Sequence, residues 1–189
     1  MIDEYSMLRE EIILSMKTVK NYNNVLYTAT VALLAFAFNF SDSALYLLPF
    51  IVVIPLYFLK KREMIQALRI GAYILVFLEK NSSIKWESRL NMYDALFRKN
   101  SHKHIPLNAY LGISFLCISL SVANTDYSVF DSYNITLMII QIILSIVSLV
   151  AFGFLSPNYI SIKSEYIKQW TKIKTMEETE KIKSEIIHL

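Results

Sequence analysis

Long apolar runs separated by polar segments dominate the pattern of this chain. Residues 21–59 contain one charged side chain, Asp42, and residues 105–162 contain two, Asp126 and Asp131. A helix that spans a bilayer needs about 20 consecutive, mostly apolar residues, and about 17 at the least. Each run is long enough for two such helices joined by a short turn. The pattern therefore predicts four transmembrane helices, at residues 22–40, 44–59, 106–124 and 134–155.

The second predicted span, residues 44–59, is short and contains two prolines. Its length requires a nearly upright helix or a locally thinned bilayer. Pro49 and Pro55 fall inside it, and each would free the carbonyl group four residues back, that of Leu45 or Ile51. In lipid such carbonyls need other partners. The prolines therefore indicate either a kinked helix packed against its neighbours or a wetted helix that lines a pore or forms a hinge.

The polar segment at the N-terminus, residues 3–20, predicts an amphipathic helix, with acidic residues at its start and lysines at its end, as the helix dipole favours. Its apolar side chains recur at a spacing of three or four residues, and they are Tyr5, Leu8, Ile12, Met16 and Val19. Such a helix either lies on the membrane surface or pairs with another helix. Its mixed polar face favours pairing.

The segment between the two apolar runs, residues 60–104, predicts a helical hairpin. Its apolar stretch Ile70–Leu78 is too short to span a bilayer, so we expect it to be buried. A break at Asn81–Ser83 precedes a second helix, whose aromatic and apolar side chains share one face and comprise Trp86, Leu90, Tyr93 and Phe97. The tail, residues 158–189, predicts one or two helices with a stripe of Tyr166, Trp170 and Ile173.

Composition supports this membrane interpretation, since 54% of the residues are apolar, 19% are charged and the mean hydropathy is +0.39. A soluble domain is normally less apolar and carries more charge. We therefore expect an all-α integral membrane protein of five segments. These are an N-terminal cytoplasmic helix (1–21), a transmembrane hairpin (22–59), a cytoplasmic helical hairpin (60–105), a second transmembrane hairpin (106–155) and C-terminal cytoplasmic helices (156–189).

The basic residues are segregated along the chain. Of the 19 Lys and Arg residues, 3 fall in residues 1–21, 10 in residues 60–104 and 6 in residues 156–189, whereas the short loops 41–43 and 125–133 have none. The positive-inside rule then predicts that both termini and the middle segment are cytoplasmic and that both loops face outward. The Ile-, Lys- and Asn-rich composition suits a bacterial gene of low GC content, which indicates the inner (plasma) membrane. The net charge of +3 is too small to indicate direct nucleic-acid recognition.

Signals of catalysis or of cofactor and metal binding are weak. Gly71, Gly112 and Gly153 lie too far apart to form a phosphate-binding loop, and the pair His102 and His104 lacks the cysteine or carboxylate neighbours of a metal site. The predicted spans contain no ionisable residue at membrane depth, which ion-coupled transporters and intramembrane enzymes usually need. The sequence therefore predicts neither an enzyme nor a cofactor.

Uncharged polar residues do recur at helical spacing in the spans. The third span carries Tyr110, Ser114, Cys117, Ser121 and Asn124, the fourth carries Asn134, Met138, Gln141, Ser145 and Ser148, and the first carries a small-residue face of Thr28, Ala32, Ala35 and Asn39. Such stripes permit close helix packing with hydrogen bonds between helices. Alternatively, one stripe lines a pore built by several subunits, and the candidate pore-lining residues are then Ser114, Ser121, Asn124, Gln141, Ser145 and Ser148.

Two features of the first half resemble small multi-pass bacterial membrane proteins of anti-phage defence operons, including pore-forming effectors associated with nucleotidyltransferases. They are the run Arg69–Glu79 followed by Lys85-Trp86-Glu87, and a helix containing Leu8–Glu11 that leads into a hairpin of spans; the resemblance covers about residues 5–90. It implies an oligomeric effector that depolarises the cell when a nucleotide or partner signal changes. The related two-span families lack the second pair of spans.

The cytoplasmic hairpin is the candidate regulatory part, with Arg69, Glu79, Trp86, Glu87 and Arg89 as its candidate residues. Arg69 and Arg89 either close salt bridges within the hairpin or bind an anionic ligand such as a nucleotide, and salt bridges are the simpler expectation. The first hypothesis is thus an oligomeric pore regulated from the cytoplasm. The alternative is a non-conducting scaffold that recruits a soluble operon partner through its cytoplasmic helices.

Overall fold

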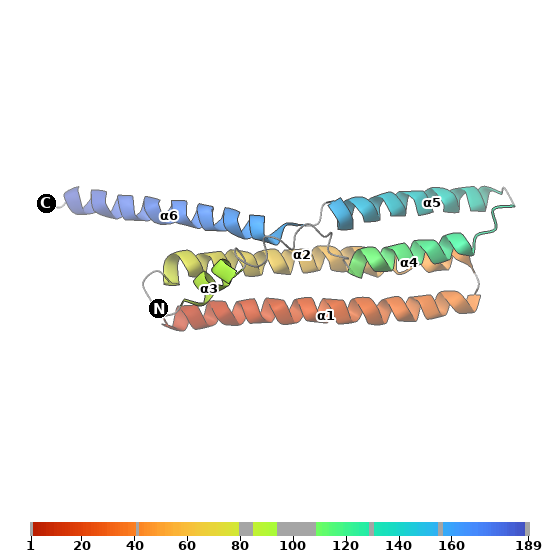
Figure 1. Ribbon diagram of the computed structural model, residues 1–189, viewed down its shortest axis with the longest axis horizontal. Helices are drawn as coiled ribbons and strands as arrows, with labels where there is room; N and C mark the ends of the chain where they lie inside the picture. The colour runs from red at the N-terminus through yellow and green to blue at the C-terminus, as the bar shows by residue number, and fades with distance from the viewer. Residues whose placement is uncertain are drawn as a thin grey trace. The chain divides into compact units, whose positions relative to one another are not determined.

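The computed structural model describes residues 2–40, 42–79, 85–93, 109–128, 131–154 and 157–187, and these residues contain helices and turns but no strand (Figure 1). In chain order the helices are α1 (Ile2–Phe40), the 3₁₀-helix η1 (Ser43–Leu47), α2 (Phe50–Tyr73), the π-helical η2 (Ile74–Leu78), α3 (Trp86–Tyr93), α4 (Ala109–Ala123), α5 (Ser132–Ser148), the π-helical η6 (Leu149–Phe154) and α6 (Tyr159–Ile187). The predicted all-α class is therefore confirmed.

Within the described residues, three helical stretches are long and apolar enough to cross a membrane, namely Glu4–Phe40, Ser43–Leu78 and Ser132–Gly153. The remaining apolar helix, α4, has 15 residues, fewer than a span needs. Residues 106–108, with which the predicted third span begins, lie outside the described residues. The structure thus fits a membrane protein, and the four-span topology stays a prediction.

The first helix differs from the prediction of a cytoplasmic helix followed by a separate span. α1 is one helix of 39 residues. Its sequence contains neither proline nor glycine, so no residue removes a backbone donor or favours a turn. The polar residues Asn21, Asn23 and Asn24 are accommodated within this continuous helix.

The prediction that Pro49 lies inside a helix is wrong. Asp42 caps η1, because its Oδ1 accepts a hydrogen bond of 2.9 Å from the backbone N–H of Ala44, and the chain then forms a 3₁₀ turn instead of a continuous α-helix. The carbonyl of Leu45, predicted to be freed, accepts 3.1 Å from the N–H of Leu48. Pro49 precedes the first turn of α2, where its missing N–H costs nothing. Pro55 does lie inside α2, as predicted.

The chain forms two compact units. Unit 1 comprises Met1–Thr18, Arg62–Lys103 and Pro157–Leu189, and unit 2 comprises Val19–Lys61 and His104–Ser156. α1 and α2 supply residues to both units. The predicted five-segment division relative to a bilayer stays a prediction.

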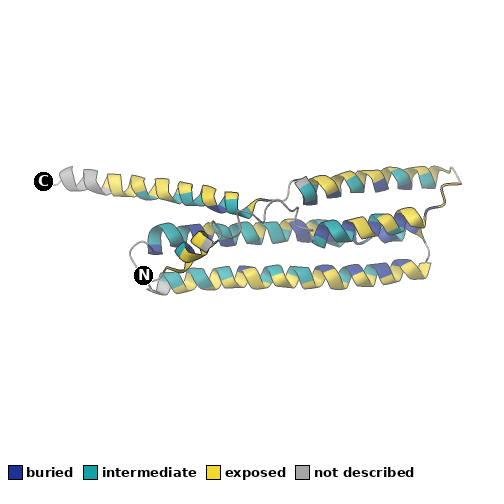
Figure 2. Ribbon diagram, viewed as in Figure 1, coloured by how far each residue is buried: buried dark blue, intermediate teal, exposed yellow. Residues whose placement is uncertain are grey.

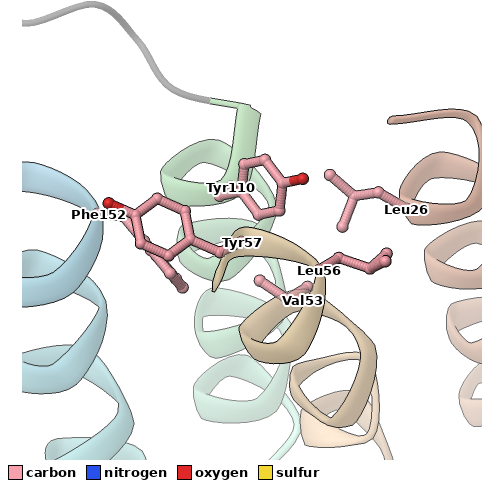
Figure 3. Close-up of a cluster of buried hydrophobic side chains, with 6 residues drawn as sticks. All are labelled: Leu26, Val53, Leu56, Tyr57, Tyr110 and Phe152. Carbon is pink, nitrogen blue, oxygen red and sulfur yellow. The ribbon is translucent and has the colours of Figure 1, made fainter. Parts of the chain in front are cut away.

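Unit 2 has an aromatic core to which α1, α2, α4 and η6 contribute (Figure 3), and its buried side chains are Leu26, Val53, Leu56, Tyr57, Tyr110 and Phe152. The Tyr57 ring lies edge-on to Phe152 and Tyr110, with centroid distances of 4.7 and 5.5 Å. Its hydroxyl donates a 2.9 Å hydrogen bond to the carbonyl of Ala151 in η6. The tyrosine therefore ties α2 to the π-helical end of the last apolar helix.

The buried residues of α5 lie along the side turned to α4, and its exposed residues lie along the opposite side (Figure 2). The exposed side is rich in isoleucine, with Ile135, Ile139, Ile142, Ile143 and Ile146 all largely accessible. An uncharged, branched aliphatic surface of this kind suits contact with lipid tails. The side of α5 that faces α4 is therefore polar, and its exposed side is apolar.

Unit 1 buries the apolar stretch between residues 70 and 78, as predicted. Ile70, Ile74 and Leu78 form a core against which Tyr5, Leu8 and Ile12 of α1 pack. This contact confirms that the N-terminal apolar stripe pairs with another helix, although Met16 is 42% exposed and the packed part ends before it. The tail is one helix within the described residues, and its Trp170 packs edge-on against Tyr73 at 5.3 Å.

Candidate functional site

A buried polar network in unit 2 joins α4, α5 and η1, with the amide of Gln141 at its centre. The Gln141 Nε2 donates to Ser121 Oγ at 2.9 Å and to Thr125 Oγ1 at 3.1 Å, and its Oε1 accepts from the Tyr127 hydroxyl at 3.2 Å. Ser121 Oγ in turn donates to the carbonyl of Ser43 at 2.8 Å. Two of the candidate pore-lining residues, Ser121 and Gln141, are therefore bonded to each other within one chain.

The other candidate pore-lining residues follow the same face or lie beside it. Ser114 and Ser148 are buried, and their hydroxyls have no hydrogen-bond partner among the described residues. Leaving a buried hydroxyl unpaired costs about 1–3 kcal/mol. Ser145 is half-buried and donates to the carbonyl of Gln141 at 2.7 Å. Asn124 is exposed and donates to the carbonyl of Leu120 at 2.8 Å, so it stands apart from the others.

A cavity of about 390 Å³ that is open to the outer surface adjoins the polar network between α4 and α5, and Ile142 and Ile146 in its lining are both 56% exposed. Its polar lining comes from Gln141, Ser145 and Tyr127, and its apolar lining from Ile118, Val122, Met138, Ile142 and Ile146. The prediction placed these polar residues on a lumen shared by several subunits. The structure places Ser114, Ser121, Gln141 and Ser148 in the interior of a single chain.

The small-residue face of α1 has the opposite placement. Thr28, Ala32, Ala35 and Asn39 are all exposed. The Thr28 hydroxyl donates to the carbonyl of Asn24 at 2.9 Å, so its donor is satisfied within its own helix. Alanines at this spacing allow another helix to approach the backbone closely. The face is therefore open to close contact with another helix.

In unit 1 the buried carboxylate of Glu79 caps the N-terminus of α3. It accepts hydrogen bonds from the backbone N–H of Glu87 at 2.5 Å, from the N–H of Ser88 at 2.8 Å and from Ser88 Oγ at 2.6 Å. The first N–H groups of a helix lack partners within the helix and favour negative charge. Glu79 is only 1% exposed, and these donors replace the water that its carboxylate loses.

A buried ion pair joins α3 to α6. Lys163 Nζ lies 2.8 Å from Glu87 Oε2, and each side chain is 9% exposed. Gly71 of α2 lies against the same carboxylate, because a Cβ added at this position would be 3.1 Å from Glu87 Oε2. Removing one partner of a buried pair typically costs about 3–5 kcal/mol. Three helices thus meet at one carboxylate.

The candidate regulatory residues therefore have different placements. Glu79 and Glu87 lie together, whereas the expected salt bridges of Arg69 and Arg89 are not found: in the described part of the chain the ion pairs are Lys163–Glu87 and the exposed Arg62–Glu63. Arg69 contributes its carbonyl, which accepts from Trp170 Nε1 at 3.3 Å. A lysine of the tail, Lys163, pairs with Glu87 instead, because both α6 and α3 pack against η2.

The predicted apolar face of α3 is exposed. Trp86 is 51% and Leu90 is 38% exposed, because Glu87 and Glu79 hold the opposite side of this short helix against unit 1. The Arg9 guanidinium lies 4.8 Å from the Trp86 ring centroid. Phe97 lies outside the described residues, and the side chain of Tyr93 does too.

The sequence analysis did not single out Lys163 or Ser88. A signal for Lys163 was present, because it shares the helical face of Tyr166 and Trp170. A lysine that continues an apolar stripe is a candidate for a buried ion pair. Ser88 follows Glu87 directly, and its sequence position carries no comparable signal.

A pocket of about 350 Å³ in unit 1 is the nearest match to the expected anion site, and it is lined by Leu75, Val76, Glu79, Lys85, Ser88, Thr171 and Lys174. Lys85 Nζ donates to the carbonyl of Glu79 at 2.6 Å, and Lys174 Nζ donates to that of Val76 at 2.8 Å. Both ammonium groups thus neutralise the C-terminal carbonyls of a helix. A phosphate would compete with these carbonyls beside a carboxylate, and the nucleotide ligand stays a prediction.

Among the described residues no three His, Cys, Asp or Glu side chains are grouped to hold a metal ion. His102 and His104 lie outside the described residues. Comparison of the chain with protein-family models, with curated proteins and with solved structures finds no match. The functional argument therefore depends on the geometry alone.

Proposed function

We propose that this chain is an oligomeric channel-type effector of the bacterial inner membrane, regulated from the cytoplasm by unit 1, and that it acts in anti-phage defence by depolarising the membrane. The observation that carries the proposal is the buried polar network between α4 and α5, in a unit whose outer surface is aliphatic. Polar groups in the interior of a membrane protein often mark a path for ions or water.

The segregation of charge supports a topology of four spans with both termini in the cytoplasm. The two loops predicted to face outward carry Asp42, Asp126 and Asp131 but no basic residue. The Ser128 hydroxyl and backbone N–H donate to Asp126 at 2.6 and 3.0 Å, and these bonds hold the pKa of that carboxyl below its usual range. The loop therefore keeps its negative charge, as an outward-facing loop tolerates.

The exposed face of α1 supports a homo-oligomer. Ala32 and Ala35 lie on it with Thr28 and Asn39, and small residues at such spacing are common where membrane helices meet. The polar network of α4 and α5 lies elsewhere in unit 2 and is unaffected by a contact through α1. Self-association and conduction thus depend on different residues.

The connection between the two units supports regulation from the cytoplasmic side. α2 contributes Gly71 to the carboxylate of Glu87 and Tyr57 to the core of unit 2. A ligand or partner protein that alters the packing of unit 1 therefore acts on a helix that also builds the membrane part. Glu79, Glu87 and Lys163 are the groups through which such a signal acts.

Ion flux through the reconstituted protein tests this function. We expect liposomes that contain the full chain to dissipate a potassium diffusion potential, as measured with a voltage-sensitive dye. Gln141→Leu, which removes the centre of the polar network, should change the flux at least fivefold, whereas Thr136→Val should not, because the Thr136 hydroxyl bonds the carbonyl of Ser132 in its own helix. Assembled oligomers of the wild-type chain that remain electrically silent would overturn the proposal.

A non-conducting scaffold is the second candidate, and the exposed apolar residues of α3 favour it. Trp86, Leu90 and Met92 are 51, 38 and 65% exposed, and such a surface on a cytoplasmic unit suits a protein partner. This function predicts that a soluble partner co-purifies with the wild-type chain and is lost with Trp86→Ala. It also predicts that Gln141→Leu has no electrical effect.

A further inference from the structure

Ser114 and Ser148 face each other across the α4–α5 pair. Two contacts fix the antiparallel register of these helices: the hydrogen bond between Ser121 and Gln141, and the ring contact between Tyr110 and Phe152, with centroids 6.1 Å apart. Ser114 lies seven residues before Ser121, and Ser148 lies seven residues after Gln141. Counted from the aromatic pair, each serine lies four residues away. Both contacts therefore place the two serines opposite each other.

The two hydroxyls differ from several other helical hydroxyls of unit 2, although Thr30 of α1 is likewise buried without a partner among the described residues. Thr28, Thr136 and Ser145 each donate to the carbonyl four residues back in their own helix, which is the usual way to satisfy a hydroxyl in an apolar environment. Ser114, at 0% exposure, and Ser148, at 5%, make no such bond and have no partner among the described residues. Two buried and unsatisfied hydroxyls thus occupy one level of the interface.

We infer that Ser114 and Ser148 bind water between α4 and α5, and that this site continues the cavity at Gln141 and Ser145 into the interior of the protomer. Buried water typically bridges polar groups that have no other partner. The cavity of about 390 Å³ at Gln141 and Ser145 supplies the neighbouring space. Between the two lies Cys117, whose register position is opposite Ser145.

This inference deepens the proposed function and rests on it in one respect. The water bound at Ser114 and Ser148, together with the cavity at Gln141 and Ser145, would form the route for the proposed ion flux. It places that route inside each protomer, so the route is not a lumen between subunits. Uncharged hydroxyl and amide groups line this route, and they stabilise water and a passing ion without binding either tightly. The channel would then need oligomerisation for stability or gating, not for enclosing the path.

X-ray radiolytic labelling of the full chain in lipid nanodiscs tests the site. Radiolysis of a bound water produces a hydroxyl radical that oxidises adjacent side chains, and Cys117, one helical turn from Ser114, is a sensitive natural reporter. After each rate is divided by the intrinsic reactivity of its side chain toward hydroxyl radical, we expect Cys117 to be oxidised at least fivefold faster than Phe115 and Leu116, which are exposed on the outer face of α4. Irradiation in ¹⁸O-labelled water should place the label on Cys117.

The double substitution Ser114→Ala with Ser148→Ala should lower the oxidation rate of Cys117 at least fivefold, whereas Thr136→Val should leave it unchanged. Monodispersity and thermal stability of each variant show whether it is folded. Oxidation of the wild-type Cys117 no faster than that of Phe115 would overturn the inference without any variant. If Cys117 is oxidised but the protein conducts no ions, the water site is supported and the channel function is rejected. If the protein conducts ions but Cys117 is not oxidised, the channel function is supported and the water site is rejected.

Discussion

The position of the Glu87 carboxylate depends on the absence of a side chain at residue 71. A Cβ there would lie 3.1 Å from Glu87 Oε2, and the carboxylate cannot move away freely because Lys163 holds the same oxygen at 2.8 Å. Glycine inside a helix costs about 0.5–1 kcal/mol relative to alanine. The close approach of α3 explains why this cost is tolerated in α2.

We therefore expect Gly71→Ala to lower the free energy of unfolding by about 1–3 kcal/mol, since it displaces a charged hydrogen bond from its buried site. The matched control is Gly112→Ala in α4, where an added Cβ meets no atom within 4 Å. This control should be neutral or stabilising by up to about 1 kcal/mol. Unfolding in mixed detergent followed by circular dichroism measures both variants. Equal effects of the two substitutions would contradict this role for Gly71.

At the residue scale the sequence identified the buried carboxylates of unit 1 better than the residues that bind them. Glu79 and Glu87 were singled out as candidate residues of the predicted hairpin, and in unit 1 the carboxylate of Glu79 accepts the backbone N–H of Glu87. Their partners, Ser88 and Lys163, were not found, because partner choice depends on how α6 packs, and helix packing is not encoded at fixed sequence spacing. Arg89 illustrates the converse, since it is near in sequence yet exposed.

At the scale of elements, α3 is held to unit 1 by polar contacts rather than by an apolar face. Among the residues of α3 whose burial is described, the buried one is Glu87, and the large apolar side chains Trp86 and Leu90 are exposed. The helix has 8 residues, which is too short for stability in isolation. Its formation therefore depends on the cap supplied by Glu79.

Replacing Glu79 by alanine removes the acceptor of three hydrogen bonds at this helix N-terminus. Loss of a helix cap costs about 1–2 kcal/mol, so we expect amide hydrogen exchange in residues 86–93 to become at least about tenfold faster. Glu63→Ala, which removes the partner of the exposed Arg62, should leave exchange of α3 unchanged. Unaltered protection of α3 in Glu79→Ala would show that the cap does not hold this helix.

Apolar periodicity predicted the helices of this chain but placed some boundaries wrongly. The run of apolar residues correctly indicated helices around residues 22–40 and 134–155. The N-terminal amphipathic helix and the first span were predicted as separate segments, yet they form one helix in which no proline or glycine intervenes. Pro49 was assigned to a helix interior because hydropathy does not distinguish an apolar 3₁₀ turn from an α-helical one.

At the scale of the whole molecule, membrane insertion explains the composition most directly. Three helical stretches have the length and apolarity of spans, and the exposed side of α5 is aliphatic. In water such surfaces would favour aggregation. The third predicted span, whose helix α4 has 15 described residues, is the one that helix length supports least.

The topology is tested most directly by thiol labelling of intact cells in a Cys117→Ser background, which leaves the chain without another cysteine. Ser128→Cys lies in the loop between α4 and α5, and Ser164→Cys lies near the start of α6, and both positions are exposed. We expect a membrane-impermeant maleimide to label Ser128→Cys from outside and to label Ser164→Cys only after the cells are permeabilised. Labelling of Ser164→Cys in intact cells, or protection of Ser128→Cys until permeabilisation, would contradict four spans with both termini in the cytoplasm.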